Sequence, residues 1–123
     1  MDLVRHLTYE IERGVRSLAL YTGSHDELAE IKSLLTSMQL EYIVSEDDGG
    51  TYNLYFGRPE CIQALRRFST LKLNEMSEEE DFMVGVMLGY DLCRQCARYD
   101  RRKLDTELAT EPCAFQISEA TIA

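Results

Sequence analysis

The sequence predicts an α+β domain in which a small, mostly antiparallel β-sheet packs against helices. Some segments repeat apolar residues at helical spacing, whereas others are short runs rich in β-branched and aromatic residues. Two of these runs, residues 40–45 (LEYIVS) and 51–56 (TYNLYF), stand on either side of the turn sequence EDDGG at 46–50. The predicted order is therefore helix, strand, helix, strand, strand, helix, helix.

Composition limits the class of protein. The 123 residues are 45% apolar and 28% charged, which excludes a disordered chain and fits one domain. The formal charge of −9 argues against a nucleic-acid partner, because phosphates repel a net anion. No run approaches the roughly 18 apolar residues of a membrane span. Residues 1–6 (MDLVRH) carry charge where a signal peptide needs apolar residues, so we expect a cytoplasmic protein.

The first half of the chain predicts two helices and a strand. A first helix with Leu3, Val4, Leu7 and Ile11 on one face ends at Gly14. Residues 15–22 (VRSLALYT) predict a buried strand. Ser24 and Glu27 have capping-box spacing and open a second helix. Its apolar face contains Leu28, Ile31, Leu34, Leu35 and Met38.

The second half predicts the hairpin and the remaining helices. Pro59 suits the first turn of a helix whose face carries Ile62, Leu65 and Phe68. A second capping box, Ser77 to Glu80, opens one long C-terminal helix that reaches about Lys103. Residues 104–123 have weak periodicity. We therefore expect a single domain over residues 1–103, with about four helices, and a peripheral tail over 104–123.

The topology follows from the order of the strands. A strand–helix–strand unit places its two strands parallel, and the hairpin then folds the third strand back. The simplest sheet puts residues 51–56 in the middle, antiparallel to both neighbours. This β-α-β-β core is half of a ferredoxin-like fold. Its two exposed edges need cover, which pairing with a second copy would give to one of them.

The long helix suggests a dimer. The stretch from Phe82 to Cys96 is apolar in nearly every helix direction, so we expect protein to enclose it. Gly85 and Gly89 would weaken an exposed helix by about 1 kcal/mol each, which suggests close backbone approach. A helix over 77–103 would be about 40 Å long, beyond the roughly 35 Å diameter of the domain. We expect a homodimer through this helix (Phe82, Gly85, Val86, Gly89 and Tyr90), a sheet edge, or both; the alternative is a monomer whose tail covers the surface.

Part of the chain resembles a known family. Residues 79–91 (EEDFMVGVMLGYD), with Gln95-Cys96, Arg98-Tyr99 and residues 53–57 (NLYFG), resemble a small bacterial family of domains of unknown function. The resemblance covers roughly residues 1–103. It implies an α+β fold, homodimers and association with a flavodoxin-type protein. It supplies no catalytic residues and no cofactor.

Four cysteines, at 61, 93, 96 and 113, raise a second hypothesis. Cys93 and Cys96 have the C-x-x-C spacing of redox and zinc sites. In the predicted long helix they stand well past its N-terminus, where the dipole does little to stabilise a thiolate. We therefore favour buried, reduced cysteines over a redox-sensing pair or a metal site.

Other candidate sites are weaker. Arg58, before the helix that starts at Pro59, is the better of two anion or ligand sites, although a plain turn is the simpler interpretation. His6 and His25 are the only histidines, and no catalytic set is visible. The bases of 94–103 match the helix dipole and could also meet an acidic partner.

These observations favour a cytoplasmic, non-enzymatic, homodimeric interaction or regulatory module, and the resemblance adds an electron-transfer flavoprotein as its partner. The alternative is a thiol-based protein that senses redox state or binds metal through Cys93 and Cys96. A third hypothesis is small-ligand binding in a dimer cleft lined by Tyr52, Tyr55 or Arg58.

Overall fold

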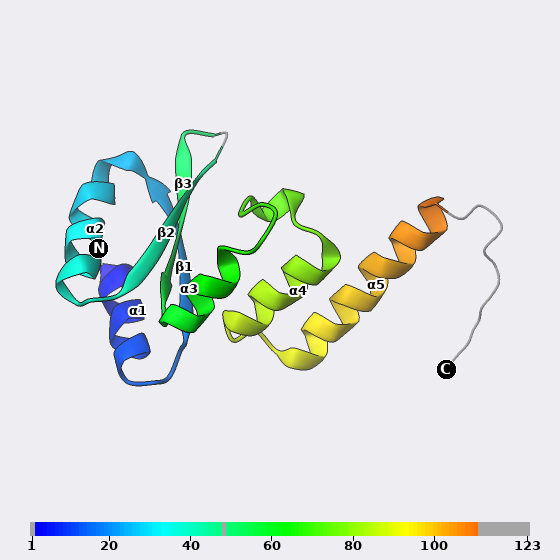
Figure 1. Ribbon diagram of the computed structural model, residues 1–123, viewed down its shortest axis with the longest axis horizontal. Helices are drawn as coiled ribbons and strands as arrows, with labels where there is room; N and C mark the ends of the chain where they lie inside the picture. Colours follow the sequence, from blue (N-terminus) through cyan, green and yellow to red (C-terminus); the bar gives the residue numbers. More distant parts are fainter. Residues whose placement is uncertain (1, 48, 111–123) are drawn as a thin grey trace.

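The computed structural model describes residues 2–47 and 49–110. This part of the chain forms a three-stranded sheet, five α-helices and two 3-10 helices (Figure 1). The strands are β1 (Leu18–Ser24), β2 (Glu41–Glu46) and β3 (Thr51–Gly57). The helices are α1 (Asp2–Glu12), η1 (His25–Glu27), α2 (Leu28–Ser37), α3 (Pro59–Leu65), η2 (Leu73–Glu75), α4 (Glu78–Met87) and α5 (Leu92–Thr110). The predicted α+β class is confirmed, with five α-helices where about four were expected.

The sheet has the predicted topology. Its strand order is β1-β3-β2, and β3 is antiparallel to both neighbours. Leu54 in β3 lies opposite Tyr21 of β1 and Val44 of β2. Gly50, with φ at +81°, supplies the left-handed residue that the hairpin turn requires.

Helices cover both faces of the sheet, α1 and α2 on one side and α3 and α4 on the other (Figure 1). Side chains of β3 alternate between the two cores. Tyr52, Leu54 and Phe56 join the core under α1 and α2, whereas Tyr55 joins the core under α3 and α4. The first core also contains Val4, Leu7, Ile11, Ala19, Ile31 and Leu35, and the second Leu18, Ile62, Leu65, Met76, Val84 and Leu88.

Strand β1 starts later than predicted, because residues 15 and 16 complete the end of α1. Gly14 adopts a φ of +78°, and the backbone amides of Val15 and Arg16 donate to the carbonyl of Glu10. This is the helix stop expected at Gly14. Arg16 also donates through its guanidinium to the Leu88 carbonyl at 3.3 Å, which ties this loop to the end of α4.

The capping box predicted at Ser24 does not form. Its side chain makes no capping hydrogen bond, and residues 25–27 form the 3-10 turn η1 before α2 begins. Glu27 instead accepts a hydrogen bond from the Tyr21 hydroxyl at 2.9 Å. The Glu27 carboxylate, which the capping-box spacing predicts at the helix start, is therefore hydrogen-bonded to a side chain of β1.

Helix α5 lies on the far side of α4 from the sheet (Figure 1). It runs to Thr110, so residues 104–110 belong to a helix and not to the predicted tail. The rest of that tail, residues 111–123, lies outside the described residues. No helix in the described part of the chain is both long and apolar enough to cross a bilayer.

Candidate functional site

The single long helix predicted over 77–103 is wrong: the chain turns back at Gly89 to form a hairpin of α4 and α5. Gly89 has a φ of +85°, and the Tyr90 amide donates to the Gly85 carbonyl at 3.0 Å. Together with the Gly89 amide bond to the Val86 carbonyl, this is a Schellman end. Asp91 then caps α5, because its carboxylate accepts from the Arg94 amide at 2.9 Å.

The capping box at the start of α4 forms as predicted. The Ser77 hydroxyl accepts from the Glu80 amide, and the Glu80 carboxylate accepts from the Ser77 amide, both at 3.1 Å. Glu80 also accepts from the Ser69 amide at 2.8 Å. These hydrogen bonds, first the one from Ser69 and then the one from Ser77, lower the pKa of Glu80. The Glu80 carboxylate thus connects the loop that follows α3 with the start of α4.

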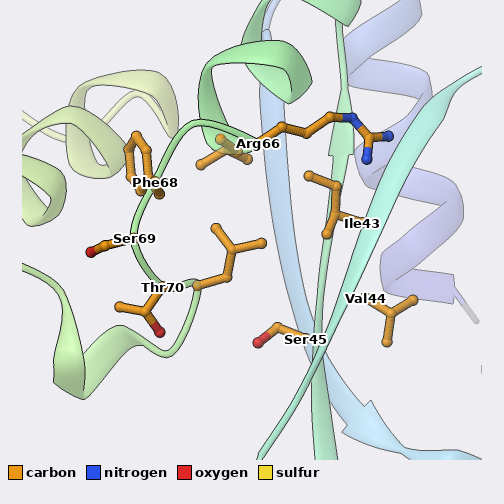
Figure 2. Close-up of a pocket in the computed structure, with 9 residues that line it drawn as sticks. Ile43, Val44, Ser45, Arg66, Phe68, Ser69 and Thr70 are labelled. Carbon is orange, nitrogen blue, oxygen red and sulfur yellow. The ribbon is translucent and has the colours of Figure 1, made fainter.

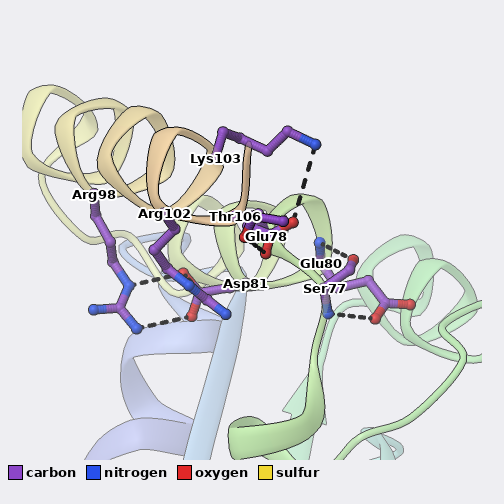
Figure 3. A network of polar contacts seen from close by, with 8 residues as sticks. All are labelled: Ser77, Glu78, Glu80, Asp81, Arg98, Arg102, Lys103 and Thr106. Carbon is purple, nitrogen blue, oxygen red and sulfur yellow. Dashed lines mark hydrogen bonds and ion pairs between the residues drawn. The ribbon is translucent and has the colours of Figure 1, made fainter. Parts of the chain in front are cut away.

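Acids of α4 and bases of α5 hold the hairpin together (Figure 3). Arg98 donates to the Asp81 carboxylate at 2.8 and 3.3 Å, and Arg102 lies 3.4 Å from the same group. Lys103 lies 3.1 Å from Glu79 and 4.0 Å from Glu78. Two hydroxyls add to the network: Tyr99 donates to Glu79, and Thr106 donates to Glu78, each at 3.0 Å.

This network shifts the pKa values of its members. The Lys103 ammonium, followed by the Tyr99 hydroxyl, lowers the pKa of Glu79, and Glu79 in turn raises the pKa of Lys103. The hydrogen bond to Asp81 raises the pKa of Arg98. Three of the basic residues in 94–103, namely Arg98, Arg102 and Lys103, therefore form ion pairs with acids of α4 within the same chain.

The close backbone approach expected at Gly85 exists, but towards α5 and not towards the sheet or another chain. A Cβ on Gly85 would overlap the carboxamide of Gln95, which is buried against it. At Gly89 the space that a Cβ would fill is open, with no atom within 4 Å, and this glycine serves as the helix stop. Phe82 packs on the Tyr99 ring, with 5.5 Å between centroids.

The expectation that protein encloses the stretch around Val86 is contradicted within this chain. Val86 is 44% exposed and Tyr90 58% exposed. The five residues predicted for the dimer helix are thus divided: Phe82 and Gly85 face α5, whereas Val86, Gly89 and Tyr90 reach the surface. Met83 and Leu92 extend the exposed apolar surface beside them.

The outward face of α5 was missed by the sequence analysis. Leu104 is 52% and Leu108 is 54% exposed, and Ala97 is exposed on the same side. Both leucines lie beyond residue 103, where the domain was predicted to end. Their helical spacing from Ala97 was the available signal. We call Cys93, Ala97, Leu104 and Leu108 the outward stripe of α5.

The prediction of buried cysteines is wrong for Cys93 and Cys96, which are both free and exposed. Cys93 is the second residue of α5 and Cys96 follows one turn later. The break at Gly89 therefore places the C-x-x-C pair in the first turns of a helix and not deep inside one. Cys61 is partly buried, and burial raises the pKa of its thiol. Cys113 lies outside the described residues.

Arg58 makes a poor anion site. It precedes the short helix α3, and its guanidinium lies 4.0 Å from the Glu60 carboxylate, whose charge would repel an anion. Its amide donates to the Ser17 carbonyl at 2.9 Å and is not available to a ligand. A single cleft lined by Tyr52 and Tyr55 is excluded, because both are fully buried on opposite faces of the sheet.

Polar and concave features also lie away from the α4–α5 hairpin. His25 lies 3.0 Å from Glu46, and its ring is 5.5 Å from the ring of Tyr52. Among the described residues no three His, Cys, Asp or Glu side chains gather as metal ligands would. A groove of about 470 Å³ runs beside β2, between Ile43 and the loop that carries Phe68 and Thr70 (Figure 2).

A family model agrees with the resemblance to a domain of unknown function noted in the sequence. A family model described as "Protein of unknown function (DUF2023)" matches residues 2–102. The chain belongs to the DUF2023 family. No curated protein matches it. The DUF2023 match ends within α5, before Leu104 and Leu108.

The charged network predicts that attachment of α5 to α4 depends on pH. Glu79 has a lowered pKa, so its stabilising effect is present above its ordinary value of 4.5 and is lost as pH falls through the lowered pKa. Lys103 has a raised pKa, so its effect is present below 10.5 and is lost as pH rises through the raised pKa. We expect protection of α5 amides from hydrogen exchange to fall outside this window, while protection of β3 stays unchanged.

A matched pair of variants tests this expectation. Glu79→Gln should reduce α5 protection at pH 7, and 1 M salt should do so in the native chain, because exposed ion pairs are screened. Asp105→Asn removes an equal charge from exposed α5 surface and should change little. Equal loss of protection in both variants would contradict a role for the Glu79 contacts.

Proposed function

We propose that this DUF2023 chain is a non-enzymatic interaction or regulatory module that works as a cytoplasmic homodimer and associates with a flavodoxin-type electron-transfer protein. The observation that carries the proposal is the inverted packing of α5. Its polar side faces α4 through ion pairs, and its apolar outward stripe faces solvent. A surface helix normally buries its apolar side, so the stripe suits a partner surface.

Association with a flavoprotein is supported by the sequence resemblance, and the exposed basic charge on α5 is compatible with an acidic partner. Arg94 is exposed on α5, while the acids of α4 engage Arg98, Arg102 and Lys103. An acidic partner would therefore approach α5 near Arg94.

Two measurements test the proposal. Light scattering at micromolar concentration should give twice the 14.2 kDa chain mass. Titration with a purified flavodoxin-type protein should release or absorb heat, and the effect should weaken as salt is raised. A monomer at all concentrations would remove the dimer. A titration without a heat change would contradict the flavoprotein partner but not the dimer.

The second candidate function is thiol chemistry at Cys93 and Cys96, which their exposure in the first turns of α5 now favours. Native protein should show two more fast-reacting thiols in a colorimetric titration than a Cys93→Ser, Cys96→Ser variant. Treatment with hydrogen peroxide would join the two sulfurs, with release of water and loss of two hydrogens from the protein mass. Unreactive thiols and a metal-free preparation would reject this candidate.

A further inference from the structure

The outward stripe of α5 has the form of a helix-pairing seam. At 100° per residue, Cys93, Ala97, Leu104 and Leu108 fall within about 60° of one another. Gln95 and Arg102, which face α4, lie on the opposite side of the helix. Between residues 92 and 109, Gln95 alone is buried. The apolar side of a 19-residue helix is therefore uncovered in the described chain.

Charges beside the stripe specify the direction of a partner helix. Asp100 lies about 50° to one side of the stripe and Arg101 about 50° to the other, and both are exposed. Two parallel helices related by a two-fold axis would bring Asp100 next to the partner's Arg101, and the reverse. An antiparallel pair would bring acid to acid and base to base. Charge complementarity thus favours a parallel pair of identical helices.

One alternative dimer mode, pairing at the β2 edge of the sheet, has unfavourable charges. A symmetric antiparallel pairing of β2 about Ile43 and Val44 would set Glu41 opposite the partner's Glu46. Like charges directly opposite destabilise strand pairs, and charged side chains on edge strands oppose edge-to-edge association. Between a helix and the β2 edge, the charges favour a helix, and among the helices α5 has the longest uncovered apolar side.

We infer that a second copy of this chain docks on the outward stripe of α5, with the two α5 helices parallel and in register. Ala97, Leu104 and Leu108 then meet their own counterparts, and Cys93 lies beside the partner's Cys93. This inference rests on the homodimer of the proposed function and names its surface. Because Cys96 lies about 60° from Cys93 around the helix, it is held away from its counterpart.

Crosslinking of single-cysteine variants with bismaleimidoethane tests the register. One variant keeps Cys93 and the other keeps Cys96, with the remaining cysteines replaced by alanine. The two are matched, because they differ only in the place of the thiol on the same exposed turn. The Cys93 variant should give roughly fivefold more covalent dimer than the Cys96 variant, because Cys93 lies within the seam and Cys96 lies outside it. Equal yields, or more dimer through Cys96, would overturn the arrangement.

Mass measurements on point variants separate this inference from the proposed function. Leu104→Glu should convert the dimer to a 14.2 kDa monomer with an unchanged far-ultraviolet spectrum, because Leu104 is exposed in the single chain. Val86→Glu, at a similarly exposed position on α4, should leave the dimer intact. If Val86→Glu dissociates it and Leu104→Glu does not, the dimer stands and α5 is not its surface. A native chain that is monomeric throughout would reject both proposals.

Discussion

Replacing Gly57 by alanine should destabilise the domain by roughly 3 kcal/mol or more, because the new Cβ would meet fixed backbone. Gly57 ends β3 with a φ of +156°, between Leu18 of β1 and Glu41 of β2. A Cβ there would overlap the Ser17 carbonyl oxygen and lie 2.9 Å from the Leu18 Cα. That carbonyl also accepts from the Arg58 amide, so it cannot move without loss of a hydrogen bond. Urea unfolding followed by circular dichroism measures the change.

Alanine substitutions at two other glycines give reference values for the loss of stability expected at Gly57. Gly49 has nothing within 4 Å of an added Cβ, so Gly49→Ala should change the free energy of unfolding by less than about 0.5 kcal/mol. At Gly85 the obstacle is the Gln95 side chain, which can rotate away, so alanine should cost an intermediate amount and loosen α5. A Gly57→Ala protein as stable as Gly49→Ala would show that β1 and β3 can separate at this end without penalty.

The sheet was predictable because its signals are local. Residues 51–56 carry aromatic and β-branched side chains on both faces and follow a glycine turn, which predicts a central strand. In the structure β3 is buried from Tyr52 onward, while β2 stays partly exposed at the edge. The start of β1 was misplaced because a strand propensity at Val15 competes with the backbone hydrogen bonds that end α1.

The hairpin of α4 and α5 was not predictable from hydrophobic periodicity alone. In the run from Phe82 to Cys96, apolar residues stand on both sides of the turn, so periodicity alone does not mark it. Gly89 and Asp91 were the local signals, a helix stop followed by a cap, but glycine in an apolar helix also fits close packing. What distinguishes the two is the contact of Gln95 with Gly85, which only the folded chain shows.

That single turn decides the character of the candidate site. It brings Asp81 to Arg98 and leaves the opposite side of α5 to solvent, whereas a straight helix would have left these acids and bases at its two ends. It also moves Cys93 from mid-helix to a first turn. Functional surfaces built from the relation of two helices are set by tertiary geometry, which local periodicity does not specify.

Tyr55 should be the most sensitive side chain of the second core. It is fully buried, and its hydroxyl donates to the Leu71 carbonyl at 2.9 Å, which fixes the loop between α3 and η2. Tyr55→Ala should cost about 3–5 kcal/mol, since it leaves an aromatic-sized cavity. Tyr55→Phe keeps the ring and should cost about 1 kcal/mol for the lost hydrogen bond.

Alkaline pH provides an independent test of the same residue. Burial raises the pKa of Tyr55 from 10 to about 12, so the fold favours the neutral phenol. Its contribution is complete below pH 10 and is lost as pH rises through about 12, by roughly 3 kcal/mol in total. Tyr55→Phe should therefore lose less stability than the native chain between about pH 9 and pH 12. The control Tyr9→Phe, at an exposed position, should lose as much stability as the native chain. If Tyr55→Phe also loses as much stability as the native chain, the phenol of Tyr55 in the native chain is accessible to hydroxide in the folded state.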